Sequence, residues 1–122
     1  LEILPNVEVI GAGASSTSIM RWSDTVINYA SGVVLEAIAD GKPIINPRYM
    51  HNNYTIIDVT GASIEVNDLA QLLATLKALQ DDDLPISLDA AHKTLMGEAV
   101  YGGREPFDVL EAYCSLVVDE TL

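Results

Sequence analysis

Ser31 and Gly32 are the residues whose types and position best suit ligand chemistry. They form a small-residue loop between the apolar run 25–29 and a helix-forming run that begins at Val33. A strand that leads into such a loop leaves unpaired backbone N–H groups and the positive helix end at one point. Phosphate groups bind at sites of this kind. The loop therefore predicts an anion site. The alternative is an ordinary helix N-cap, because Ser and Gly are common there whether or not a ligand is bound.

Glu36 strengthens the binding hypothesis for this loop. It lies four residues after Gly32, so a helix places it about one turn beyond the loop. A carboxylate there can accept hydrogen bonds from vicinal hydroxyls such as those of a ribose. The alternative is a solvated helix residue, which the neighbouring Leu35, Ala37 and Ile38 disfavour.

Arg48 and His51 form the second candidate group. They follow the apolar pair Ile44 and Ile45, and open α/β sheets bind ligands at the carboxyl ends of their strands. Arg48 could neutralise a diphosphate, and His51 could donate a hydrogen bond to a phosphate or sugar oxygen. Each is explained equally well as an ordinary surface-loop residue.

Other motifs favour structural explanations. Gly11-x-Gly13-x-x-Ser16 lacks the third glycine of a dinucleotide fingerprint, so it predicts a turn. His92 has no second ligand at a convincing spacing, and we expect a structural role for it. The acidic run 81–83 lacks the Gly and Glu of a calcium loop and predicts a solvated helix end. The sequence therefore predicts no metal site.

These residues must be positioned by an alternation of strands and helices, which is typical of an α/β fold with a mostly parallel sheet and flanking helices. Strands are expected at 7–10, 25–29, 44–45 and 55–59, and helices at 16–22, 32–40, 69–79, 89–100 and 106–118. Gly41 suits a left-handed helix end, and Pro43 prevents the helix from continuing. We expect a single domain over 1–122, with 88–122 as a closing helical segment.

Composition and charge narrow the function classes. The 122 residues are 49% hydrophobic and 20% charged, which indicates a globular chain. A net charge of −12 repels phosphate backbones, so nucleic-acid binding is excluded as the main role. A phosphate-bearing metabolite can still bind through backbone amides and one or two cations. The single cysteine, Cys114, permits no intrachain disulfide and fits a reducing cytoplasm.

The chain also resembles a known family through four runs. They are Ser-Asp-Thr-Val-Ile (23–27), Ala-Ser-Gly-Val (30–33), Leu-Glu-Ala-Ile (35–38) and Gly-Lys-Pro-Ile-Ile (41–45). Together they resemble the carboxyl-terminal donor-binding half of GT-B glycosyltransferases and their relatives, among them UDP-N-acetylglucosamine 2-epimerases, CDP-glycerol glycerophosphotransferases and capsule polysaccharide transferases. The run 6–10 is similar to the preceding strand in those proteins, and 101–104 with 109–110 to their closing turn and helix.

The resemblance implies a Rossmann-like sheet, an incomplete GT-B carboxyl-terminal domain. It implies that Ser31 and Gly32 hold the phosphates of the donor and that Glu36 binds the ribose. Arg48 and His51 fall in a loop that contacts diphosphate or sugar in these families. The donor, a nucleotide sugar or a CDP-activated compound, is a substrate, and no cofactor is implied.

The family's domain begins with further strand–helix units, so we expect this chain to be a fragment. In a sheet of order 3-2-1-4-5-6 the missing strands would separate the strand at 7–10 from that at 25–29. The expected partners are the missing amino-terminal domain or a second copy paired through the exposed sheet edge. The fragment alone is expected to bind nucleotide weakly and to catalyse nothing. Its parent would be a glycosyltransferase or sugar-nucleotide epimerase of surface polysaccharide synthesis, cytoplasmic or peripheral to the inner membrane.

Two other functions stay open. In the first, the chain is a non-catalytic α/β interaction module, in which Ser31 and Gly32 only cap a helix and the acidic surface serves solubility or a protein partner. In the second, it is a Rossmann NAD-binding domain that uses Gly11 and Gly13. Convergence of Gly32, Glu36 and Arg48 on one open cleft would favour the donor-binding function, whereas a Glu36 side chain that points into the core or away from the Gly32 amides would contradict it.

Overall fold

The computed structural model describes residues 4–28, 31–83, 88–100 and 114–117. Its centre is a parallel sheet of order β1-β2-β3, formed by Val26–Ile27, Ile44–Pro47 and Ile64–Val66. Ile45 pairs with Ile27 on one side and with Ile64 on the other, so β2 is the central strand. The chain is therefore an α/β protein with a small open parallel sheet, as its sequence predicts.

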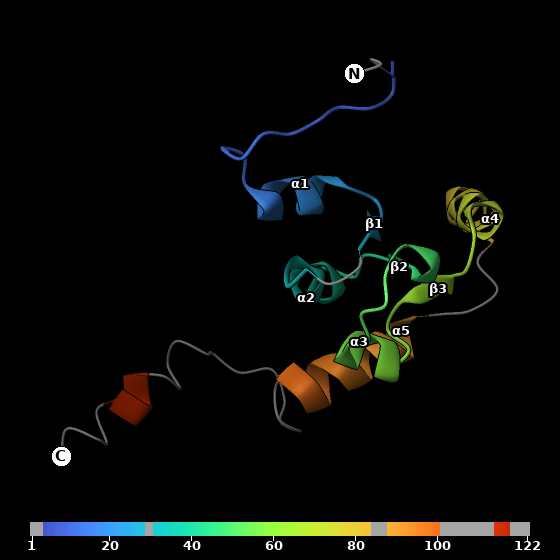
Figure 1. Cartoon of the computed structure of the whole chain (residues 1–122). Helices are drawn as coiled ribbons and strands as arrows, with labels where there is room; N and C mark the ends of the chain where they lie inside the picture. The colour runs from blue at the N-terminus through green and yellow to red at the C-terminus, as the bar shows by residue number, and fades with distance from the viewer. Residues whose placement is uncertain (1–3, 29–30, 84–87, 101–113, 118–122) are drawn as a thin grey trace.

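Helices flank this sheet on both sides. They are α1 (Ser16–Trp22), α2 (Val33–Ala39), α3 (Ile56–Val59), α4 (Leu69–Gln80) and α5 (Asp89–Thr94), with a 3-10 turn η1 (Arg48–Met50) after β2 and a π-helical segment η2 (Leu95–Val100) after α5. α2 and α5 lie on one side of the sheet, and α4 lies on the other (Figure 1). The predicted helices at 16–22, 32–40, 69–79 and 89–100 are confirmed.

Local capping explains where these helices begin and end. The side chain of Ser15 accepts a hydrogen bond from the amide of Ser18 at the start of α1, and that of Asp68 accepts one from Gln71 at the start of α4. Each bond satisfies a backbone donor that a helix start leaves unpaired. After α2, Gly41 has a φ of +73°, the left-handed conformation that glycine adopts without strain.

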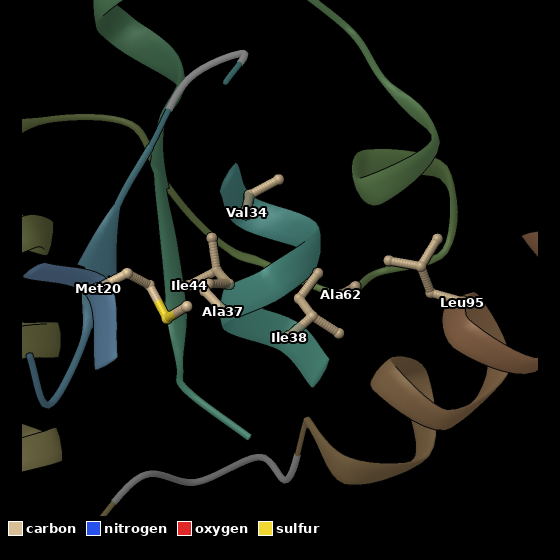
Figure 2. Packing of buried hydrophobic residues seen from close by; sticks show 7 residues of the cluster. All are labelled: Met20, Val34, Ala37, Ile38, Ile44, Ala62 and Leu95. Carbon is tan, nitrogen blue, oxygen red and sulfur yellow. The ribbon is translucent and has the colours of Figure 1, made fainter. Parts of the chain in front are cut away.

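The hydrophobic core lies between α2 and the sheet. Val34, Ala37 and Ile38 share one face of α2 and are buried, as is every residue of β2. Figure 2 shows these side chains in a cluster that runs from Met20 of α1, past Ile44, to Ala62 and Leu95. Because β2 is the central strand of a parallel sheet, both of its faces are buried, and most of its side chains are apolar.

The prediction of a strand at 55–59 is wrong, because these residues form α3 and its N-cap, Thr55. The side chain of Thr55 accepts a hydrogen bond from the amide of Ile57, and the Thr55 amide donates to the carboxylate of Asp58 at 2.7 Å. This reciprocal pair is a capping box, which begins a helix whatever the β-branched content of the run. The third strand is instead Ile64–Val66, which the sequence analysis missed.

The expected strand at 7–10 is also wrong. This segment runs past α1 without pairing with any described strand, and its side chains are exposed. A strand is stable only beside a neighbour that satisfies its backbone groups. The edge of β1 that faces away from β2 also pairs with no described strand, and Ile27 is 48% exposed there. Trp22 at the end of α1 is 85% exposed.

Most of the predicted carboxyl-terminal elements lie outside the described residues. The turn at 101–104 and most of the helix at 106–118 belong to this part, and only residues 114–117 are described there as helical. Within the described residues, no helix has both the length and the apolar character that crossing a membrane requires.

Core burial predicts the effect of shortening Ile44. We expect Ile44→Ala to lower the free energy of unfolding by about 3 kcal/mol, because it removes buried methyl groups and leaves a cavity. Val59→Ala is the control, since Val59 is 63% exposed and should change stability by less than about 0.5 kcal/mol. Urea denaturation followed by circular dichroism measures both. Equal effects of the two variants would contradict this description of the core.

Candidate functional site

The loop between β1 and α2 presents Ser31 and Gly32 at the carboxyl end of β1. The amide of Ser31 donates to Oδ1 of Asn28 at 3.2 Å, and the hydroxyl of Ser31 accepts a bond from the amide of Val33 at 3.4 Å. Both Ser31 and Gly32 are exposed, and a Cβ built on Gly32 would meet no atom within 4 Å. The backbone at Gly32 is therefore open to a ligand. Asn28, which holds the loop, was missed in the sequence analysis.

Glu36 faces α1 rather than the loop after β2. Its carboxylate accepts a hydrogen bond from the hydroxyl of Thr17 at 2.8 Å. Glu36 lies two residues after Val34 along α2, so the two side chains point to nearly opposite faces of the helix, and Val34 faces the core. The structure therefore does not bring Glu36 together with Arg48 and His51.

Arg48 is bound within its own loop. Its guanidinium donates to the backbone carbonyl of Asn53 at 2.5 Å and lies 3.9 Å from the carboxylate of Asp58. The same group lies over the ring of Tyr54, 5.4 Å from its centroid, which adds a cation–π contact. Arg48 thus holds the loop after β2 in shape, and its guanidinium does not extend toward Gly32.

His51 has a similar role. Its Nε2 lies 2.6 Å from Oδ1 of Asn46, and its Nδ1 accepts a hydrogen bond from the amide of Asn53 at 3.1 Å. Since an amide oxygen only accepts and a backbone N–H only donates, the neutral ring carries its proton on Nε2. Both ring nitrogens therefore bond within the protein, and the expected donation to a ligand oxygen does not fit this arrangement.

A buried carboxylate joins these contacts. The Asp58 side chain is 2% exposed, and it accepts hydrogen bonds from Nδ2 of Asn46 at 2.5 Å and from the amide of Thr55 at 2.7 Å. Neither Asn46 nor Asp58 was singled out in the sequence. The Thr-x-x-Asp spacing of the capping box was the signal that could have found Asp58.

The loops after β1 and β2 meet at a small cavity. It has a volume of about 10 Å³, near the lower limit for one water molecule. It is lined by Asn28 of the first loop, by residues of the second, and by core residues: Asn28, Val34, Ile44, Asn46, His51, Thr55, Ile57, Asp58 and Ser63. The hydroxyl of Ser63 is buried and has no hydrogen-bond partner in the described part of the chain.

The other sequence motifs lie away from these loops. His92 is buried, with Nε2 2.8 Å from the carbonyl oxygen of Ala62, which confirms a structural role. Gly11 and Gly13 lie in an exposed stretch, and residues 4–10 before it form no strand, unlike the segment before the glycines of a dinucleotide fold. The run 81–83 is an exposed helix end, as expected. In the described ranges, no three His, Cys, Asp or Glu residues are grouped to hold a metal ion.

No protein-family model, curated protein or solved structure matches this chain.

The unpartnered hydroxyl of Ser63 predicts an unusual response to truncation. Burying a hydroxyl without a hydrogen bond is unfavourable, so we expect Ser63→Ala to leave stability unchanged or to raise it by about 1 kcal/mol. Ser15→Ala, which removes a helix cap, should lower it by about 1 kcal/mol. Thermal and urea unfolding compare the two variants. A clear loss of stability in Ser63→Ala would mean that the hydroxyl makes a hydrogen bond, for example to a water molecule in the cavity.

Proposed function

We propose that this chain is the donor-nucleotide-binding part of a glycosyltransferase-like enzyme of surface polysaccharide synthesis, related to GT-B carboxyl-terminal domains. One observation carries the proposal beyond the sequence resemblance. The loops that leave the carboxyl ends of β1 and β2 adjoin, and the first of them exposes Ser31 and Gly32. Ligands of open α/β sheets bind at this end of the strands.

The distribution of charge supports a phosphate-bearing ligand. The chain has no acidic residue between Asp40 and Asp58, and the part of this stretch that follows β2 contains Arg48 and His51. In a protein of net charge −12, this is a long stretch from which negative charge is missing. A diphosphate at Gly32 would thus meet less repulsion than over most of the surface, although Arg48 does not contact it directly.

Glu36 contributes on the α1 side of the loop. Its exposed carboxylate already accepts a hydroxyl hydrogen bond, the one from Thr17. The hydroxyl of a ribose offers the same donor chemistry and could take the place of Thr17. The nucleoside would then lie between α1 and the start of α2, while the diphosphate extends toward the loop after β2.

The open edge of β1 supports a parent protein with further strands. Parallel sheets are normally covered, yet β1 pairs with no described strand on its outer side and Ile27 is half exposed. A further strand–helix unit of the parent would cover this edge. The groups that act on the acceptor would come from the other half of the parent, so the chain by itself is expected to be inactive.

A protein-interaction module is the second candidate function, and a different feature favours it. A hollow of about 680 Å³ lies between the amino-terminal segment and α1, and its lining includes Val7, Ile10, Ile19 and Trp22. These apolar side chains would suit a protein partner, and this hollow involves neither Ser31 nor Glu36.

Nucleotide titration tests the donor site at Gly32. We expect the chain to bind UDP, CDP or GDP weakly, and Gly32→Ala to weaken binding about tenfold, because a methyl group would stand between the amide and a phosphate. Gly11→Ala is a matched control, since its added methyl group also meets no atom within 4 Å. Isothermal titration calorimetry measures the affinities. Failure of the wild-type chain to bind any of the three would remove the proposal.

Two conservative variants test Glu36. If the carboxylate binds ribose, Glu36→Gln should lower nucleotide affinity about tenfold, whereas Thr17→Val should leave it unchanged or raise it slightly. If Glu36 only joins α1 to α2, both variants should lose similar stability and neither should change affinity. Titration and urea unfolding of the two proteins separate these cases.

A further inference from the structure

Asp58 is a buried carboxylate to which the proposed function gives no task. Asn46 donates to its Oδ1, and the Thr55 amide donates to its Oδ2. The hydroxyl of Thr55 is 3.2 Å from the same Oδ2, and the guanidinium of Arg48 is 3.9 Å from it. A carboxylate that is 2% exposed is costly to bury, and each of these contacts offsets part of that cost.

The contacts of Asp58 continue as a chain of hydrogen bonds with one fixed direction. Asp58 can only accept, so Nδ2 of Asn46 must face it. Oδ1 of Asn46 therefore accepts a hydrogen bond from Nε2–H of His51. In this tautomer Nδ1 of His51 carries no proton, so it accepts the hydrogen bond from the amide of Asn53. The charge on Asp58 therefore sets the orientation of the Asn46 amide and the tautomer of His51.

The same chain closes the loop after β2 on itself. Asn46 belongs to the buried central strand, and Asp58 belongs to α3, so the bond between them joins the two ends of the loop. His51 ties the middle of the loop to Asn46, and Arg48 ties its start to Asn53. The loop is thus ordered from a rigid strand.

We propose that Asp58 is a positioning residue for the ligand site, which holds the loop 48–55 in its binding shape through Asn46 and His51. This inference rests on the proposed function, because it needs a ligand at the adjoining β1–α2 loop. The cavity shared by Asn28, His51 and Thr55 places the two loops side by side. A ligand that meets an ordered loop does not have to supply the entropy of ordering it.

A charge role for Asp58 is the competing explanation. In that case the carboxylate would serve only as the counter-ion of Arg48, at 3.9 Å. The two explanations differ in a testable way, because the hydrogen-bond chain can be rebuilt with the carboxylate moved to position 46. In the double variant Asn46→Asp/Asp58→Asn, the carboxylate at 46 accepts from His51 and from the new amide at 58. That amide's oxygen accepts from Thr55, so every bond of the chain is restored.

The experiment compares the wild-type chain, Asp58→Asn, the double variant and the control Asp40→Asn, which removes an exposed charge. Three quantities are measured: hydrogen exchange of the Asn53 and Thr55 amides, the 15N shifts of the His51 ring, and the affinity for the nucleotide that the wild type binds. We expect Asp58→Asn to speed exchange in the loop, to mix the tautomers of His51 and to weaken binding about tenfold. The double variant should restore all three, and Asp40→Asn should change none.

Each outcome has a distinct meaning. Loss in Asp58→Asn with recovery in the double variant supports the positioning role. Loss in both variants overturns it in favour of the charge role, and a loosened loop with unchanged affinity overturns it while the proposed function stands. If Asp58→Asn unfolds, the double variant alone decides. Loop exchange and affinity equal to those of the wild type would support the positioning role, and loss of both would exclude it. If the wild type binds no nucleotide although its His51 ring shows the Nε2–H tautomer, the proposed function is overturned, and this inference with it.

Discussion

Complete burial of β2 is the constraint on which the rest of the structure depends. A central parallel strand must bond to a strand on each side and be covered on both faces. The α2 helix supplies one cover because Val34, Ala37 and Ile38 fall on a single face of its short length. Asn46 is the one polar residue of this strand, and its amide must find partners inside the protein. The hydrogen bonds to Asp58 and His51 follow directly from that requirement.

The sequence predicted those elements whose local signals agree with their burial. Gly41 marked the end of α2, where the backbone adopts the left-handed conformation that glycine accepts without strain. The run 55–59 misled because its composition favours a strand while a side-chain cap begins a helix. The run 7–10 has a strand pattern, but a strand also needs a neighbour, and a pattern within one segment cannot reveal whether that neighbour exists.

The candidate site was predicted in part for a similar reason. Spacing along the chain correctly placed Ser31 and Gly32 at an exposed loop beyond β1 and Arg48 and His51 in the loop beyond β2. Spacing could not show that Glu36 faces α1, nor that Arg48 and His51 use their donors within their own loop. Such pairings depend on which side chains meet across the fold, and Asp58, which accepts hydrogen bonds from Asn46 and Thr55, lies three residues beyond the loop 48–55.

The strong negative charge of the chain affects whether other chains can add to the outer edge of β1. An edge strand that pairs with no described strand on its outer side, and whose Ile27 is half exposed, is a template on which another chain could add a strand. Mutual repulsion between copies that each carry −12 opposes that addition at neutral pH. Acidification or concentrated salt removes this repulsion while the edge stays as it is. The isolated chain should therefore be handled in neutral buffers of low ionic strength, where its acidic side chains protect it from edge-to-edge aggregation.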